Sequence, residues 1–225
     1  MKTTAIIVAA GTGSRFNSDT PKQFLELAGK PLIVHTLERF QSAPSIDSIV
    51  LVLAADRTDT FRALASQITK LTAVVAGGKS RAESVMKGLH AVDRETGIVA
   101  VHDGARPFVS VDEIDRTVSK AREMGAACLV GPVTDTIKSV RGGEISATLD
   151  RAKLRRALTP QVFRIEVLRT AFERAELDER VTDECYLVEQ LGHPIAIVEG
   201  SSRNIKITHA EDLALAEALL RDGGR

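Results

Sequence analysis

The sequence predicts an α/β fold: a Rossmann-like, mostly parallel sheet with helices on both faces. Short apolar runs alternate with segments that carry apolar residues at helical spacing, which is typical of βαβ units. Several of the runs, such as SIVLVLAA from Ser48 to Ala55, are continuously apolar, as expected for strands covered on both faces. A length of 225 residues with 44% hydrophobic residues allows a sizeable core. We therefore expect a single domain over residues 1–225.

The expected strands and helices follow one another in order along the chain. Apolar runs bounded by turn residues predict strands. They cover residues 5–9, 48–55, 72–78, 97–108, 126–133 and 195–200, and the fourth leads from its strand into a loop. Apolar residues at a spacing of three and four predict helices. They cover residues 31–43, 57–68, 80–92 and 110–125, with a further helix opening at the sequence VTDE and a terminal helix from Ala210.

Polar residues mark the expected starts of several helices. Three pairs have the S/T-x-x-E spacing of a capping box, in which the side chains of both residues accept backbone N–H groups at the helix start. The pairs are Ser80 with Glu83, Ser110 with Glu113, and Thr208 with Glu211. Thr182 in VTDE is the predicted N-cap of its helix, which gives this threonine a complete structural role.

The alternation of strands and helices stops between residues 134 and 158. Gly142 and Gly143 form a turn signal flanked by polar, β-prone segments, which predicts a β-hairpin. The segments are too polar to build a core alone, so we expect the hairpin to project from the sheet and pack on another surface. A second copy of the chain is the simplest partner. Residues 134–158 are therefore predicted to be a dimerisation arm.

The composition argues against several classes of protein. Lys and Arg number 30, as do Asp and Glu, so a surface built to coat nucleic acid or an anionic membrane is not expected. The sequence contains no run of about 18 apolar residues, so no membrane span is predicted. The apolar stretch at the N-terminus is too short for a signal peptide. Cys128 and Cys185 form no C-x-x-C pair. A reduced, cytoplasmic location is the expectation.

The loop VAAGTGSRFNSDTPKQF, residues 8–24, is the first candidate site. Gly11 and Gly13 fit the start of a G-x-G-x-x-G fingerprint, but Phe16 occupies the third glycine position and the expected ribose-binding acid is missing. A P-loop needs G-x-x-x-x-G-K-[ST], and in this loop no Gly-Lys-Ser/Thr follows Gly11, so a P-loop is also excluded. Small residues after a strand let backbone N–H groups approach phosphate oxygens. Arg15 and Lys22 add two cations, although a tight turn with two solvated charges explains the same residues.

Other glycine-rich or charged stretches also follow predicted strands, where parallel sheets bind ligands. In AGGKSRAES, Gly78 and Ser84 could read a base edge, although a helix cap explains part of this segment. In VHDGARPF, Asp103 is a hard oxygen ligand suited to Mg²⁺, and Arg106 can bind a phosphate through two parallel bonds. A turn cap is an equally good explanation for Asp103. Lys206 lies in a short strand-like run near the C-terminus, where it could simply point outward.

Taken together, these stretches resemble one enzyme family in content and in order. The stretches are AAGTGSRFNSDTPKQF, GGKSRAESV, VHDGARPF, DTIK, LTPQVF, TDE and EGSSRNIKIT followed by EDLALAE. The chain is similar over nearly its whole length to the 2-C-methyl-D-erythritol 4-phosphate cytidylyltransferases of the non-mevalonate isoprenoid pathway. The resemblance implies a nucleotidyltransferase-type fold. It also implies a reaction in which CTP and methylerythritol phosphate give the CDP-alcohol and pyrophosphate, with Mg²⁺, in a homodimer joined through the arms.

The resemblance also implies a role for each matching residue. Arg15 and Lys22 correspond to the pair that stabilises the pentacoordinate phosphorus and the leaving pyrophosphate. Ala9, Ala10, Gly11 and Gly13 correspond to the triphosphate loop, Gly78 and Ser84 to the cytosine-reading positions, and Asp103 to the carboxylate near the ribose and metal. The pocket for the acceptor phosphate corresponds to Arg106, Thr136, Arg151, Thr182 and Lys206. Thr136 and Arg151 would act across the dimer.

The chemistry of this reaction suits a site rich in cations. The nucleophile is a phosphate monoester with a second pKa of about 6, so it needs no general base at neutral pH. The barrier is the approach of a dianion to an anionic triphosphate, and positioning with charge neutralisation lowers it. Alternative functions are a ribitol 5-phosphate cytidylyltransferase, an NAD(P)-dependent oxidoreductase and a non-catalytic nucleotide-binding regulator. The missing third glycine counts against the oxidoreductase.

Overall fold

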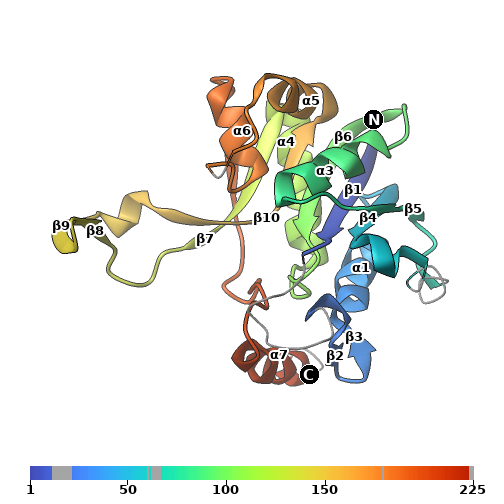
Figure 1. Ribbon diagram of the computed structural model, residues 1–225, viewed down its shortest axis with the longest axis horizontal. Helices are drawn as coiled ribbons and strands as arrows, with labels where there is room; N and C mark the ends of the chain where they lie inside the picture. Colours follow the sequence, from blue (N-terminus) through green and yellow to red (C-terminus); the bar gives the residue numbers. More distant parts are fainter. Residues whose placement is uncertain (12–21, 60, 62–66, 179, 223–225) are drawn as a thin grey trace.

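A computed structural model describes residues 1–11, 22–59, 61, 67–178 and 180–222 (Figure 1). Within these residues a seven-stranded sheet has the order β11-β7-β10-β6-β1-β4-β5. Its strands are β1 (Lys2–Ala9), β4 (Ser48–Leu53), β5 (Leu71–Ala76), β6 (Thr96–Asp103), β7 (Ala126–Pro132), β10 (Arg155–Arg164) and β11 (Ala196–Glu199). All neighbouring strands pair in parallel except β10, which is antiparallel to both β6 and β7. The predicted α/β class is confirmed.

Helices cover both faces of this sheet because alternate residues of each strand point to opposite sides. In β1, Ile7 belongs to the cluster that contains α1 (Leu32–Ser42) and α4 (Val111–Met124). Its neighbour Ile6 belongs to the cluster on the other face. That face carries α3 (Arg81–His90), α5 (Ile165–Arg174) and α6 (Glu184–Gln190). Burial on both sides explains why the strands read as continuous apolar runs.

Two of the three predicted capping boxes start helices where expected. Ser110 accepts from the N–H of Glu113, and the Glu113 carboxylate accepts from the N–H of Ser110. Ser80 accepts from the N–H of Glu83 at the start of α3, but the Glu83 carboxylate accepts instead from the N–H of Lys79. At the other end of α4, Gly125 has a φ of 89°, a conformation that favours glycine over other residues.

Two predicted helix caps are wrong. α7 begins at Glu211 and ends at Asp222, so Thr208 does not cap it, and the Asp212 carboxylate accepts from the N–H groups of Thr208 and His209. The N-cap of α6 is Asp183, whose side chain accepts from the N–H of Tyr186, while Thr182 is exposed. At α6 the aspartate next to the expected cap makes a charge-assisted hydrogen bond, and before α7 the carboxylate of Asp212 accepts two N–H groups in the same way.

The sequence analysis missed β10, which lies in the middle of the sheet. Residues Gln161, Val162 and Phe163 pair with β6 on one side and β7 on the other. Pro160 interrupts the apolar pattern and cannot donate to a ladder, and the register with β7 shifts between Ala157 and Gln161 to accommodate this segment. Lys206 lies in an irregular segment rather than in the strand-like run that was expected.

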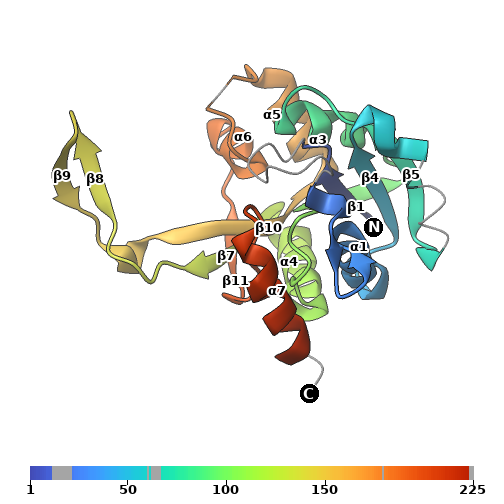
Figure 2. The ribbon, with the colours of Figure 1, turned by 60° about the horizontal axis from the view of Figure 1, so that its bottom comes forward.

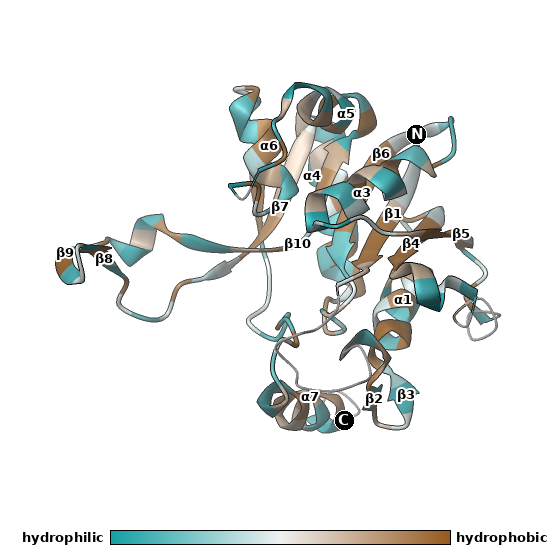
Figure 3. Cartoon of the chain, viewed as in Figure 1, coloured by the Kyte–Doolittle hydropathy of each residue, from teal (hydrophilic) through white to brown (hydrophobic). Residues whose placement is uncertain are grey.

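The predicted hairpin is present and projects away from the main sheet (Figures 1 and 2). β8 (Lys138–Arg141) and β9 (Glu144–Thr148) form a separate antiparallel pair, joined by Gly142 and Gly143 with positive φ. A short 3₁₀ helix, η5 (Arg151–Lys153), leads from it into β10. Figure 3 shows hydrophobic positions on both hairpin strands. They include Val140 and Ile145, which are 62% and 67% exposed.

The C-terminal helix α7 packs beside the small β2–β3 hairpin rather than on the main sheet (Figure 1). β2 (Glu26–Leu27) and β3 (Lys30–Pro31) follow the short helix η2 (Lys22–Phe24). Leu27, Ile207 and Ala216 belong to a small buried cluster that joins these elements. The predicted helix over 57–68 begins near η3 (Ala55–Arg57), and half of its residues lie outside the described part of the chain. No helix in the described part of the chain is long and apolar enough to cross a membrane.

Candidate functional site at the carboxyl edge of the sheet

Loops from several strands meet at the carboxyl edge of the sheet. β1, β5 and β6 run in the same direction, so the segments after Ala9, Ala76 and Asp103 leave the sheet on one side. The sequence places the predicted nucleotide-binding residues in or beside these three segments, whereas Thr136, Arg151, Thr182 and Lys206 come from other parts of the chain. Parallel α/β sheets bind ligands at this edge, outside the carboxyl ends of the strands.

The loops after β1 and β5 lie in close contact. A Cβ atom added to Gly77 would come within 2.3 Å of the Ala10 Cβ atom, so only glycine fits at this position. Ser84 accepts a hydrogen bond from the N–H of Gly78 at 3.0 Å and donates to the Ser80 carbonyl oxygen. The loop entry is held by Gln23, whose amide donates to the carbonyl oxygens of Ala9 and Gly11.

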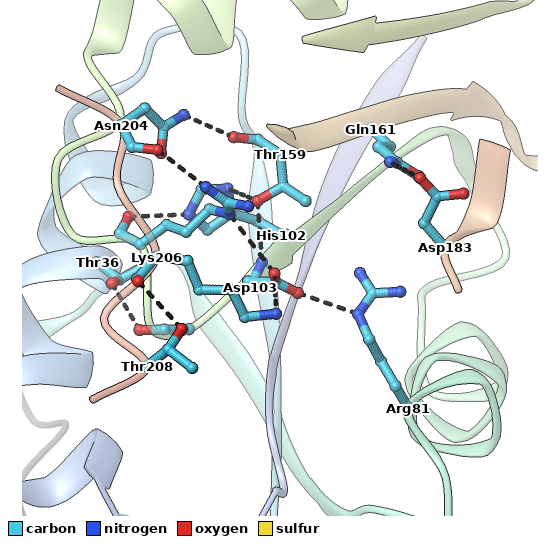
Figure 4. A network of polar contacts seen from close by, with 12 residues as sticks. Thr36, Arg81, His102, Asp103, Thr159, Gln161, Asp183, Asn204, Lys206 and Thr208 are labelled. Carbon is cyan, nitrogen blue, oxygen red and sulfur yellow. Dashed lines mark hydrogen bonds and ion pairs between the residues drawn. The ribbon is translucent and has the colours of Figure 1, made fainter. Parts of the chain in front are cut away.

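Three cations surround Asp103 at the end of β6 (Figure 4). Lys206 Nζ lies 2.8 Å from Asp103 Oδ2, and Arg106 Nε lies 3.5 Å from the same oxygen. Arg81 Nε donates to Asp103 Oδ1 at 3.0 Å. Of the predicted site residues, Asp103, Arg106 and Lys206 are therefore brought into direct contact. Arg106 also donates through Nη1 to the carbonyl oxygen of Asn204, two residues before Lys206.

The electrostatics of this cluster favour an added anion. Burial alone raises the pKa of Asp103, but the charges of Arg81, Lys206 and Arg106 outweigh it and hold the pKa well below its usual range. Burial lowers the pKa of the Arg106 guanidinium, although Asp103 partly offsets this. Asp103 and Glu184 are the carboxylates paired with these three cations in the described residues. One positive charge therefore remains in excess.

His102 holds the turn that carries Asp103 and Arg106 through hydrogen bonds of its buried ring. His102 is fully buried, and its ring contacts Thr159 Oγ1 through Nδ1 and the Arg106 carbonyl oxygen through Nε2. Because the carbonyl can only accept, Nε2 carries the proton and Nδ1 accepts from the threonine. Thr159 Oγ1 in turn accepts from the N–H of Asp103, and its carbonyl oxygen accepts from the Asn204 amide.

A second set of contacts holds the start of α6. The Gln161 side chain donates to Asp183 Oδ2 at 2.8 Å and accepts from the N–H groups of Glu184 and Cys185. Glu184 is fully buried and its Oε1 atom lies 2.7 Å from Arg81 Nη1. Thr182, a predicted substrate-binding residue, directly precedes this turn, and the hydrogen bonds of Gln161 therefore fix the segment that carries it.

Of the remaining predicted residues, two lie on the hairpin arm and the others lie, wholly or with their side chain, outside the part of the chain that the structure describes. Thr136 and Arg151 are exposed on the hairpin arm, where Arg151 Nη1 donates to the carbonyl oxygen of Thr134 within the same chain. The arm extends away from the main sheet in both ribbon views (Figures 1 and 2). Gly13 and Arg15 lie outside the described residues, as does the side chain of Lys22. The roles predicted for these residues stay predictions.

Sequence reasoning passed over several residues of the site. Arg81 stands between Gly78 and Ser84, and Glu184 stands two positions after Thr182, so both lay inside segments already singled out. An acidic residue at a helix start, such as Glu184, and an arginine directly after an N-cap, such as Arg81, do not by themselves indicate a binding site. Thr159 and Gln161 lie in the LTPQVF stretch, which was used only as part of the resemblance. Their contacts depend on β10, which was not predicted.

Asp103 in this arrangement does not fit a magnesium ligand. Both of its oxygens are already paired with cations, and Mg²⁺ prefers free carboxylate oxygens together with phosphate and water. The described residues also contain no group of three or more His, Cys, Asp or Glu side chains that could hold a metal ion. A metal contact by Asp103 would require Lys206 or Arg81 to move away first.

An α/β sheet with cations gathered at its carboxyl edge defines the class of proteins that bind phosphorylated ligands. Within this class, the chain matches the family model described as IspD, 2-C-methyl-D-erythritol 4-phosphate cytidylyltransferase, over residues 3–222. The chain belongs to this family, and it is a cytidylyltransferase of the non-mevalonate isoprenoid pathway.

Relatives and solved structures agree with this assignment over the full length. The chain is 43% identical to the 2-C-methyl-D-erythritol 4-phosphate cytidylyltransferases of Syntrophus aciditrophicus and Bacillus velezensis, covering 98% of this chain and 96% and 97% of theirs. The crystal structure of the Thermus thermophilus enzyme superposes with a TM-score of 0.78 at 36% identity, over 98% of this chain and all of that one. The structure from Anaerococcus prevotii gives a TM-score of 0.87 at 29% identity, covering 98% and 96%.

Proposed function

We propose that the chain transfers the cytidylyl group of CTP to 2-C-methyl-D-erythritol 4-phosphate, giving 4-diphosphocytidyl-2-C-methyl-D-erythritol and pyrophosphate. The acceptor phosphate attacks the α-phosphorus in line, the bond to the pyrophosphate oxygen breaks, and no covalent enzyme intermediate forms. The observation that carries this proposal is the cluster of Arg81, Arg106 and Lys206 around one buried carboxylate, in a chain of this family.

The absence of a free general base among the described residues at this edge suits the proposed nucleophile. A phosphate monoester is already mostly dianionic at neutral pH, so no proton has to be removed from it. His102 is the histidine nearest to Asp103 in sequence, and both of its ring nitrogens are already engaged. Burial lowers its pKa to about 3, so it stays neutral and structural at working pH.

Arg106 and Lys206 are proposed to hold the acceptor phosphate. Lys206 is 38% exposed and lies at the rim of the cluster, so its ammonium group can turn from Asp103 to an incoming anion. Arg106 is more deeply buried, its Nε atom faces Asp103 and its Nη1 atom donates to the Asn204 carbonyl oxygen, so Nη2 is the nitrogen proposed to meet the phosphate. Two unit charges 4 Å apart interact by about 4 kcal/mol at an effective dielectric near 20. Positive side chains beside both substrates are therefore needed to offset the repulsion between the acceptor phosphate and the triphosphate.

The nucleotide is proposed to bind along the loops after β1 and β5. Ala9, Ala10, Gly11 and Gly13 would hold the triphosphate through backbone N–H groups, and Gly78 with Ser84 would read the cytosine. The close approach of Gly77 to Ala10 supports this, because it puts both loops in one place. Arg15 and Lys22 would stabilise the pentacoordinate phosphorus and the leaving pyrophosphate. Mg²⁺ is expected to arrive with CTP, bound to its phosphate oxygens.

The acceptor site is proposed to be completed by a second subunit. Thr182 would contact the acceptor from its own chain, whereas Thr136 and Arg151 would reach it from the arm of the partner. Exposed Val140, Ile145 and Leu149 on the arm support a homodimer, because a solitary chain would leave these apolar side chains in water.

The test is pyrophosphate release from CTP and Mg²⁺, with methylerythritol phosphate or ribitol 5-phosphate as acceptor. Release only with the first is expected. Release only with the second would keep the mechanism and replace the substrate, and no release from folded protein that binds CTP would favour the regulator.

Lys22→Ala should lower turnover by about two orders of magnitude or more, because it removes a charge that acts on the transition state. Lys120→Ala, which removes an exposed lysine paired with Glu123, is the matched control.

A further inference from the structure

A chain of ion pairs joins the start of α6 to the start of α3 and the end of β6. Glu184 Oε1 contacts Arg81 Nη1 at 2.7 Å, and Arg81 Nε contacts Asp103 Oδ1 at 3.0 Å. Figure 4 shows Arg81 reaching from α3 toward Asp103. One guanidinium therefore binds two carboxylates that belong to different elements.

The two ends of this chain belong to different parts of the proposed site. Arg81 is the first residue of α3 and follows the loop with Gly78, on the side proposed for the nucleotide. Glu184 is the first residue of α6 and follows Thr182, on the side proposed for the acceptor. Gln161 Oε1 accepts from the N–H groups of Glu184 and Cys185, which joins this first turn of α6 to β10. A shift of the loop with Gly78 or of the loop with Thr182 would therefore displace Arg81 and, through it, the other loop.

Burial makes the contact between Glu184 and Arg81 hard to replace. Glu184 is fully buried, and its second oxygen, Oε2, has no hydrogen-bond partner among the described residues. Burial raises the pKa of Glu184, and the charge of Arg81 partly offsets this. Arg81 itself is bound on both sides, and its fork geometry lets separate nitrogens serve separate acceptors. Lysine keeps the charge but has a single nitrogen.

We propose that the Glu184–Arg81–Asp103 chain couples nucleotide and acceptor binding, and that Arg81 and Glu184 are positioning residues for both substrates. This inference rests on the proposed function. Ordering of the loop at Gly78 by CTP fixes Arg81, which fixes Glu184 and the turn that carries Thr182. By linkage, the acceptor then strengthens nucleotide binding by the same factor.

The experiment measures that factor by calorimetry with α,β-methylene CTP, Mg²⁺ and methylerythritol phosphate. The nucleotide dissociation constant is measured with and without the acceptor. In the wild type we expect the acceptor to tighten nucleotide binding about tenfold, within the usual range of coupling between sites. In Arg81→Lys the factor should fall to about one, because one ammonium group cannot hold both carboxylates. Glu184→Gln, whose amide oxygen can still accept from Arg81, should retain an intermediate factor.

Arg116→Lys is the matched control, because Arg116 forms an exposed ion pair with Asp112 on α4. It should leave the factor unchanged. Thermal unfolding of each variant separates loss of coupling from loss of fold. An unchanged factor in folded Arg81→Lys, beside normal wild-type turnover, would overturn this inference and leave the proposed function standing. Failure of the wild type to bind methylerythritol phosphate would overturn both.

Discussion

His102 is a neutral imidazole that holds the turn of Asp103 and Arg106 in place. The ring is fully buried and also contacts the ring of Phe40 at a centroid distance of 4.7 Å. Burial lowers its pKa to about 3, against a usual value near 6.5. The contacts of its two ring nitrogens give this buried histidine the role of holding a functional loop.

This pKa predicts how stability depends on pH. Below about pH 6.5 the unfolded chain binds a proton at His102 that the folded chain does not, so stability falls with acidification. The loss should be about 1.4 kcal/mol for each pH unit between about 6.5 and 3. Urea unfolding at pH 7, 5.5 and 4.5 measures this loss. In His102→Gln the free energy of unfolding should change less with pH. The exposed His90→Gln is the control, and equal slopes in all three proteins would contradict the prediction.

Arg81 and Glu184 illustrate why single residues of the site escaped sequence reasoning. Neither belongs to a pattern that by itself points to a ligand, and they are 103 positions apart in the chain. Their roles come from a contact that arises only where the fold brings the first residues of α3 and α6 together. Asp103 and Arg106 were predicted because they follow a strand in a short charged loop.

The starts of α4 and α7 show how far the local sequence determines where a helix begins and how it is capped. Ser110 and Glu113 form a complete capping box, whereas Thr208 and Glu211 have the same spacing and form none. The difference lies in the neighbours, because Asp212 takes the N–H groups of Thr208 and His209. Spacing alone is therefore a necessary condition for the box and not a sufficient one.

Replacement of the cap gives a matched pair of variants. Ser110→Ala should lower the free energy of unfolding by about 1 kcal/mol, because the N–H of Glu113 loses its acceptor. For a chain of this size that corresponds to a fall of about 2–4 °C in the melting temperature. Thr208→Ala should have a smaller effect, since its hydroxyl caps no helix. Thermal unfolding followed by circular dichroism measures both, and equal losses would argue against the difference in capping.

The arm and the main sheet form one continuous structure through β10. The strand begins beside η5 on the arm and runs antiparallel between β6 and β7, where Thr159 and Gln161 hold the site loops. A dimer formed through the arm would thus act at one end of the strand that positions the site. The single-domain organisation and the dimer both stay predictions.

Mixed dimers test whether the arm completes the partner's site. Arg15→Ala and Arg151→Ala chains should each be nearly inactive alone. If Arg151 acts across the interface, a mixed dimer has one site with an intact Arg15 and an intact partner Arg151. Random mixing should then restore about a quarter of wild-type activity, because half of the dimers are mixed and each has one working site. Confirmed mixing without recovery would show that Arg151 acts within its own chain or not at all.

The sequence by itself determined the α/β class, the alternating strands and helices, the hairpin arm and the ordered motifs of the family. These depend on local periodicity, on turn residues and on short segments, and all of them can be read along the chain. Only the tertiary structure decided that β10 lies inside the sheet, that Asp183 caps α6, and that Arg81 joins Glu184 to Asp103. The place of β10 and the contacts of Arg81 depend on residues far apart in sequence. The cap of α6 is local, but Thr182 and Asp183 are both good caps by sequence, and the contact of Asp183 with Gln161 is made only in the fold.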